Sequence, residues 1–140
     1  MADTVTLATV SENDRRVVRR CVNQSDGTGS TSLLVDVSAL AARSLDNKAC
    51  STVELQRLWF ACDTGDGGDT YARIEQEDSD ADIVLLGLTG TGYWDFREFG
   101  GLKANKTSNS NEYDINLVVP STADSGNMYT VVAEFTKNYD

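Results

Sequence analysis

The chain has 140 residues, a mass of 15.2 kDa and a net charge of −10, from 22 acidic and 12 basic side chains. This length suits one hydrophobic core, so we expect a single domain spanning residues 1–140. An acidic surface repels phosphate backbones, which excludes sequence-independent nucleic-acid binding. No secretion signal and no run of about 18 apolar residues is found, so we expect no membrane span.

The composition also restricts the chemistry. Histidine is absent, which removes the commonest general base and the commonest neutral metal ligand. The three cysteines, Cys21, Cys50 and Cys62, form no C-x-x-C pair, and their odd number argues against a disulfide framework. We therefore expect free buried thiols, no catalytic residue, no cofactor and no metal ion.

Hydrophobic residues alternate with a period of two along most of the chain. This alternation predicts short strands at residues 5–10, 15–23, 32–37, 53–62, 71–76, 82–88, 93–99, 112–119 and 128–136. Clusters of Gly, Ser, Asn and Asp separate them, and only residues 38–46 look helical, with Ser38 as the N-cap. The prediction is an all-β, single-domain antiparallel β-sandwich, jelly-roll-like, with about eight strands and one short helical turn.

Residues 53–62 show the alternation most fully. One face of this strand is mostly apolar: Val53, Leu55, Arg57, Trp59 and Ala61. The opposite face becomes apolar only at its end: Leu58, Phe60 and Cys62. The pattern predicts a half-buried strand whose burial increases along its length.

The basic residues are concentrated in one strand. Arg16 and Arg20 share one face of it, and Arg15 and Arg19 share the other. Because arginine pairs well with carboxylates and is favoured at interfaces, we predict that these four residues form a partner interface. The alternative is a solvated edge strand protected by its charges.

Two Asp-containing triplets offer an enzymatic alternative. Asp63-Thr-Gly and Asp124-Ser-Gly are triplets of the kind in which aspartic proteases place two carboxylates that share a proton. The residues before Asp124 are polar, and Asp66 and Asp69 would crowd Asp63 with negative charge. We therefore expect no protease.

The acidic loops offer a calcium alternative. In residues 63–69 the carboxylates are three positions apart rather than two, which differs from the EF-hand spacing. This loop and the acidic run at residues 75–82 are expected to be solvated, with calcium binding at residues 63–69 left open.

Aromatic residues gather at 93–99, and Trp59 and Phe60 add two more. We expect Trp94, Phe96 or Phe99 to fill the core, because large aromatic side chains are usually buried. Stacking aromatics beside Asp or Asn are also used by carbohydrate-binding domains. The alternative is therefore a module that binds a glycan or a host surface through Trp59 or residues 93–99.

Several motifs together resemble a known family. They are Asp-Arg-Arg-Val-Val-Arg-Arg at 14–20, Asn-Gln-Ser-Asp-Gly-Thr-Gly at 23–29, Val-Asp-Val-Ser-Ala-Leu at 35–40, Cys50 leading to Leu-Trp-Phe at 58–60, and Trp-Asp-Phe-Arg-Glu-Phe-Gly-Gly-Leu at 94–102. The chain is similar, from Thr4 to Lys137, to small virion structural proteins of tailed bacteriophages, best represented among marine and cyanobacterial phages. It departs from them in its more acidic 63–69 and 75–82 segments.

The resemblance implies a non-enzymatic protein of the virion, made in the host cytoplasm. It implies a decoration or cement protein on the capsid exterior, a homotrimer bound to the major capsid protein lattice. A neck or tail component is the alternative.

Residues 1–60 carry equal numbers of acidic and basic side chains, and the whole excess of negative charge lies in residues 61–140. We therefore expect the arginine-bearing first part to face the shell and the acidic part to face outward.

Overall fold

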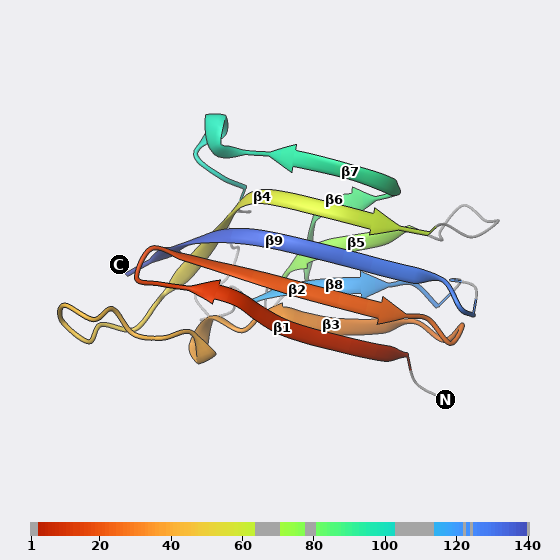
Figure 1. Ribbon diagram of the computed structural model, residues 1–140, viewed down its shortest axis with the longest axis horizontal. Coiled ribbons are helices and arrows are strands. Elements are labelled where there is room, and N and C mark those ends of the chain that lie inside the picture. The colour runs from red at the N-terminus through yellow and green to blue at the C-terminus, as the bar shows by residue number, and fades with distance from the viewer. Residues whose placement is uncertain are drawn as a thin grey trace.

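Two antiparallel β-sheets pack face to face in the computed structural model (Figure 1). The structure describes residues 3–63, 71–77, 81–102, 114–121, 123 and 125–139. The five-stranded sheet has the order β1-β2-β9-β4-β7, and the four-stranded sheet has the order β3-β8-β5-β6. The strands are β1 (Thr4–Glu12), β2 (Arg16–Gln24), β3 (Ser30–Val35), β4 (Thr52–Cys62), β5 (Ala72–Gln76), β6 (Ile83–Leu88), β7 (Gly90–Asp95), β8 (Ile115–Val119) and β9 (Met128–Asn138).

The predicted all-β sandwich is confirmed. Over the described ranges the only helical segments are two 3-10 turns, η1 (Val37–Ala39) and η2 (Arg97–Phe99). No helix in this part of the chain has the length and hydrophobicity to span a bilayer.

Eight of the strands pair in a nested order. β5 pairs with β6, β4 with β7, β3 with β8 and β2 with β9, all antiparallel. The chain from β2 to β9 is therefore one long hairpin that is folded across two layers. β1 adds a fifth strand beside β2.

Alternation along the strands builds the core between the sheets. In β9, Tyr129, Val131, Ala133 and Phe135 are all fully buried, and the residues between them face outward. Burial of each large apolar side chain contributes about 1.5–3 kcal/mol. β8 buries Ile115, Leu117 and Val119 from the opposite sheet in the same way.

A β-bulge in β4 overturns part of the predicted face assignment. The pairing of β4 with β9 shifts between Leu55 and Arg57. Val53 and Leu55 are buried before the bulge, and Leu58, Phe60 and Cys62 are buried after it. The extra residue of a bulge exchanges the two faces of a strand. Arg57, Trp59 and Ala61 therefore lie on the outer side, which the period of two does not reveal.

The bounds of the predicted elements differ from those in the structure by one to a few residues. The strand predicted at residues 15–23 begins at Arg16 and ends at Gln24. The short helical turn predicted within residues 38–46 is shorter and begins earlier: η1 spans only Val37–Ala39, and its N-cap is Asp36 instead of Ser38, with the Asp36 side chain accepting from the Ser38 amide at 3.0 Å. The strand predicted at residues 93–99 ends at Asp95, and the chain then turns through η2 to Gly100, whose positive φ of 80° suits glycine.

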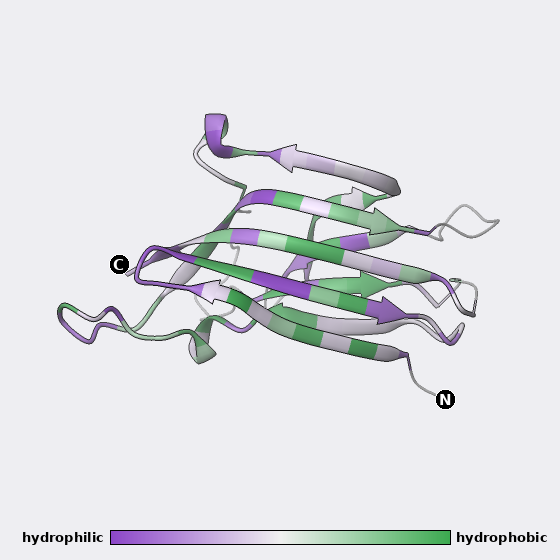
Figure 2. Ribbon diagram, viewed as in Figure 1, coloured by the Kyte–Doolittle hydropathy of each residue, from purple (hydrophilic) through white to green (hydrophobic). Residues whose placement is uncertain are grey.

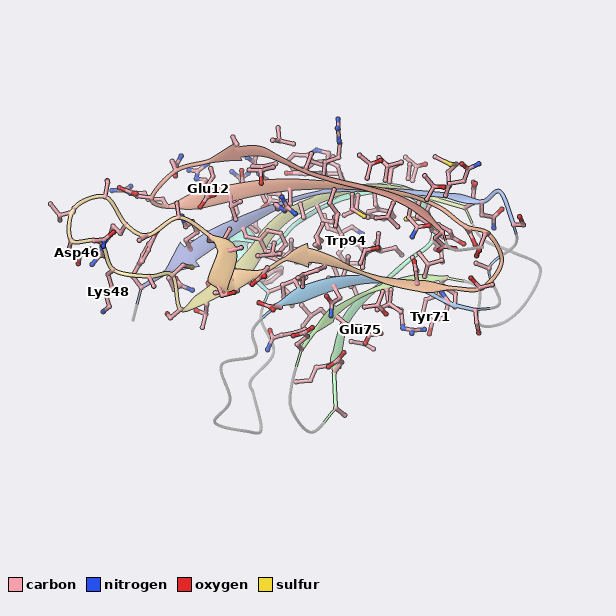
Figure 3. The ribbon with its side chains drawn as sticks, turned by 90° about the horizontal axis from the view of Figure 1, so that it is seen from below. Glu12, Asp46, Lys48, Tyr71, Glu75 and Trp94 are labelled. Atoms are coloured by element: carbon pink, nitrogen blue, oxygen red, sulfur yellow. The ribbon has the colours of Figure 1, made fainter. Side chains whose placement is uncertain are left out.

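The five-stranded sheet is wider than the sheet that it covers. At one edge, Val5 and Leu7 of β1 are each 37% exposed although they follow the inward-facing register. At the other edge, Trp94 of β7 faces inward opposite Leu58 and is 46% exposed (Figure 3). Phe99 is also exposed, so of the aromatics predicted for the core only Phe96 is buried.

Candidate functional site

The outer face of the five-stranded sheet is formed by rows of small, β-branched and aromatic residues. Two neighbouring cross-strand rows are Thr6, Val22, Thr130, Ala61 and Thr91, and Ala8, Arg20, Val132, Trp59 and Tyr93. Between them runs a shallow groove of about 270 Å³. It is lined by Trp59, Phe60, Ala61, Thr91, Gly92, Thr130 and Val132. Figure 2 shows hydrophobic segments along β4 and β9, beside the more polar β2.

Two aromatic rings lie together at this groove, and one of them, Trp59, lines it. Trp59 and Tyr93 lie on adjacent strands with their ring centroids 5.2 Å apart and their planes inclined by 34°. They are 38% and 49% exposed. The Arg57 guanidinium lies 5.3 Å from the Trp59 ring centroid, a cation–π distance. The sheet thus holds a rigid, half-exposed aromatic surface on its outer side.

Two acidic groups of this face, Glu134 and Asp95, are paired with arginines. Arg57 makes two hydrogen bonds to Glu134, at 3.0 and 2.7 Å, and Arg97 makes a similar fork to Asp95. The hydrogen bonds from Arg57 lower the pKa of Glu134 and outweigh its burial, which would raise the pKa. Both carboxylates therefore stay ionised and paired. Glu134 was not singled out from the sequence, although alternation along β9 places it on this face.

Two of the four predicted interface arginines lie on the outer face. Arg20 is exposed in the Trp59 row, and it has no ion-pair partner in the described part of the chain. The Arg16 side chain is 59% exposed and lies 3.8 Å from Glu134, a loose contact because Arg57 already holds that carboxylate. These two residues give the face its uncompensated positive charge.

The other two arginines lie elsewhere. The Arg19 side chain points to the inner side, where it donates to the Leu34 carbonyl at 2.8 Å and to Thr9 at 2.6 Å. It therefore joins β1 and β2 to β3. Arg15 is exposed in the β1–β2 turn, next to the end of β2. The structure does not bring the four arginines into one patch.

The residues considered for catalysis and metal binding are not brought together in the described ranges. Asp63 accepts a hydrogen bond from the Met128 amide at 2.9 Å, and Asp124 lies outside the described residues. The candidate calcium loop lies outside them as well, apart from Asp63. Among residues that the structure describes, no three metal-ligating side chains form a cluster.

The three cysteines are free and buried, as predicted. Burial raises the pKa of Cys21 to about 11 and that of Cys62 to about 12. Burial also raises the pKa of Cys50, which lines a cavity of about 450 Å³ beside Ser38 and Asp114. All three thiols are protonated at neutral pH, so none is an activated nucleophile.

Comparison with known proteins returned no match to any family model, curated protein or solved structure.

Proposed function

We propose that the chain is a non-enzymatic structural protein of a phage virion, a decoration or cement protein that binds the major capsid protein lattice from outside and stabilises the head. The observation that carries this proposal is the outer face of the five-stranded sheet. Its groove is apolar, and its Glu134 and Asp95 carboxylates are paired with arginines, on a chain whose net charge is −10. Exposed apolar faces bordered by arginine are typical of protein interfaces.

The strand order supports the same class of protein. Nested pairing of eight strands across two layers is the arrangement expected for a jelly roll, and we propose that β2–β9 adopt this fold. Jelly rolls occur in viral capsid proteins and also in lectins and cupins. The fold is therefore compatible with a virion role, while the specific role is argued from the outer face.

Binding to a repeating capsid lattice requires only modest contacts from the outer face of each copy. Arg16 and Arg20 can pair with carboxylates of a shell subunit, while Trp59 and the groove beside it supply apolar contact area. An oligomer that engages several equivalent shell sites multiplies such contacts by avidity. The trimer implied by the family resemblance stays a prediction.

Charge reversal tests this proposal. Replacing Arg16 and Arg20 by Glu is expected to weaken binding to purified particles by more than about tenfold per substitution, because each change removes a pairing cation and adds repulsion. Both side chains are exposed, so the circular dichroism spectrum should not change. Binding is measured by co-sedimentation of the purified chain with particles that lack it.

The matched control reverses a charge elsewhere. Lys48 is exposed on the loop between β3 and β4, at its tip in Figure 3, and Lys48→Glu should bind as the wild type does. Unchanged co-sedimentation of the Arg16/Arg20 double variant would remove the outer face as the docking surface. Equal losses of particle binding in the double variant and the Lys48 variant would show that binding depends on net charge and not on this face.

A second candidate function is glycan binding, favoured by the half-exposed Trp59–Tyr93 pair. The apolar faces of sugar rings stack on aromatic rings, and Asp95 and Arg97 would be neighbouring hydrogen-bonding groups. If this is the function, Trp59→Ala should abolish glycan-array binding and leave particle binding intact. If the particle role holds, the wild type should bind no glycan, and Trp59→Ala should weaken particle binding.

A further inference from the structure

β1 is an edge strand with little of the usual protection against strand pairing. In the described part of the chain it pairs only with β2, so the backbone groups on its other side are available. It has nine residues, whereas the other edge strands, β3, β6 and β7, have six each. From Thr4 to Ser11 it contains no charge, no proline and no glycine, and of the devices that commonly protect an edge only a β-bulge between Thr9 and Ser11 is present.

Both faces of β1 are open as well. Val5 and Leu7 face inward and remain 37% exposed because the four-stranded sheet does not cover them. Thr4 and Thr6 are exposed on the outer side. Figure 1 shows β1 along the margin of the sandwich, with β2 as its sheet neighbour. A strand added beside β1 would meet both backbone partners and apolar side chains.

We propose that a second copy of this chain pairs with β1, antiparallel, to form one continuous sheet across a two-fold axis near Leu7. The argument for a second copy comes from charge. Copies with a net charge of −10 repel one another, and β1 offers eight consecutive residues without charge to meet themselves. The only charged residue within β1, Glu12, already binds Lys137 of its own chain at 2.7 Å.

The β1 sequence complements itself in this arrangement. Pairing about Leu7 sets Leu7 opposite its own copy, Val5 opposite Thr9 and Thr6 opposite Ala8, so no facing pair carries a charge. On the inner side, Val5 and Leu7 of each copy form a single apolar strip. A two-fold contact is closed, so it gives a dimer and not a fibre. This inference does not depend on the particle role.

Sedimentation velocity of the purified chain tests the pairing. The wild type is expected to have twice the mass of the 15.2 kDa chain at submillimolar concentration, and Thr6→Lys is expected to halve that mass. Thr6 lies on the edge strand and faces outward, so lysine there charges the contact and leaves the core intact. Thr31→Lys, on the β3 edge, is the matched control and should remain a dimer.

Cross-linking locates the axis. The native cysteines are buried, so Leu7→Cys provides the accessible thiol and should give a disulfide-linked dimer under mild oxidation. Thr91→Cys, on the β7 edge, should not. A wild type that stays monomeric, an assembly that is insensitive to Thr6→Lys, or equal cross-linking through Thr91→Cys would each overturn the proposal.

Discussion

Lys137→Met is expected to lower the free energy of unfolding by about 3 kcal/mol, near the lower end of the range for breaking a buried ion pair. The Lys137 side chain is fully buried, and its ammonium donates to Glu12 at 2.7 Å and to the carbonyls of Asn13 and Ala41 at 3.1 and 3.0 Å. It thereby ties β9 to the β1–β2 turn and to the loop after η1. Methionine keeps the volume, leaves the Asn13 and Ala41 carbonyls without this donor, and leaves the Glu12 carboxylate with only the Ala41 amide.

Urea denaturation of the purified variant measures this loss. Lys48→Met is the matched control, because Lys48 is exposed and its replacement should cost less than about 0.5 kcal/mol. Adding Glu12→Gln to Lys137→Met should recover part of the stability, because the side chain that has lost its cation partner is then uncharged. If the wild type and Lys137→Met had equal free energies of unfolding, the ion pair would contribute no more to stability than a pair on the surface.

The same pair predicts a dependence on pH. Burial would raise the pKa of Glu12, but hydrogen bonds from Lys137 and the Ala41 amide outweigh it and hold the pKa below 4.5. Burial would lower the pKa of Lys137, but its hydrogen bond to Glu12 holds the pKa above 10.5. The pair's contribution is lost as the pH falls through the lowered pKa or rises through the raised one. The difference between wild type and Lys137→Met should therefore be largest from about pH 5 to 10.

Gly29→Ala is expected to lower the free energy of unfolding by about 2–5 kcal/mol, a large part of the stability of a small domain. Gly29 has a φ of +82°, and an added Cβ would lie 2.7 Å from the Ser121 nitrogen and 2.9 Å from its Cα. These are backbone atoms of the β8–β9 connection, so they cannot move aside as a side chain would. The loop from Ser25 to Gly29 is fixed there by a 2.9 Å bond from the Ser25 amide to the Asn127 carbonyl.

Gly100→Ala separates steric crowding from backbone strain. Its φ is +80°, and an added Cβ would meet nothing within 4 Å. This variant should therefore cost about 1–2 kcal/mol, the strain of the left-handed region alone. Equal losses of stability in the two variants, measured by urea denaturation, would contradict the close packing of the Ser25–Gly29 loop against Ser121.

Much of the fold could be predicted from alternation. The period of two located every strand to within a few residues, because most strands have one face in the core. The alternation also indicates that Lys137 is buried, because Lys137 falls in the same alternation as Val131, Ala133 and Phe135, which are buried. A lysine at such a position must find acceptors inside the fold. Sequence alone could not identify Glu12 as one of them, because that contact joins the two ends of the chain.

The outer face was predicted only in part. Trp59 and Arg57 reach it through the bulge after Leu55, and a bulge leaves no regular mark in the sequence. Arg16 and Arg20 were correctly placed together on one face of β2. Arg19 was assigned to the interface, but it binds the Leu34 carbonyl, because β3 crosses beneath β2 at that point. Such a contact depends on tertiary structure that local alternation does not contain.

Quantitative mass spectrometry of purified phage particles tests the central proposal most directly. A decoration protein on the shell should be present in a fixed ratio to the major capsid protein, comparable in copy number and not a minor component. A few copies per particle would indicate a neck or tail position, and absence of the chain from washed particles would contradict a virion role altogether.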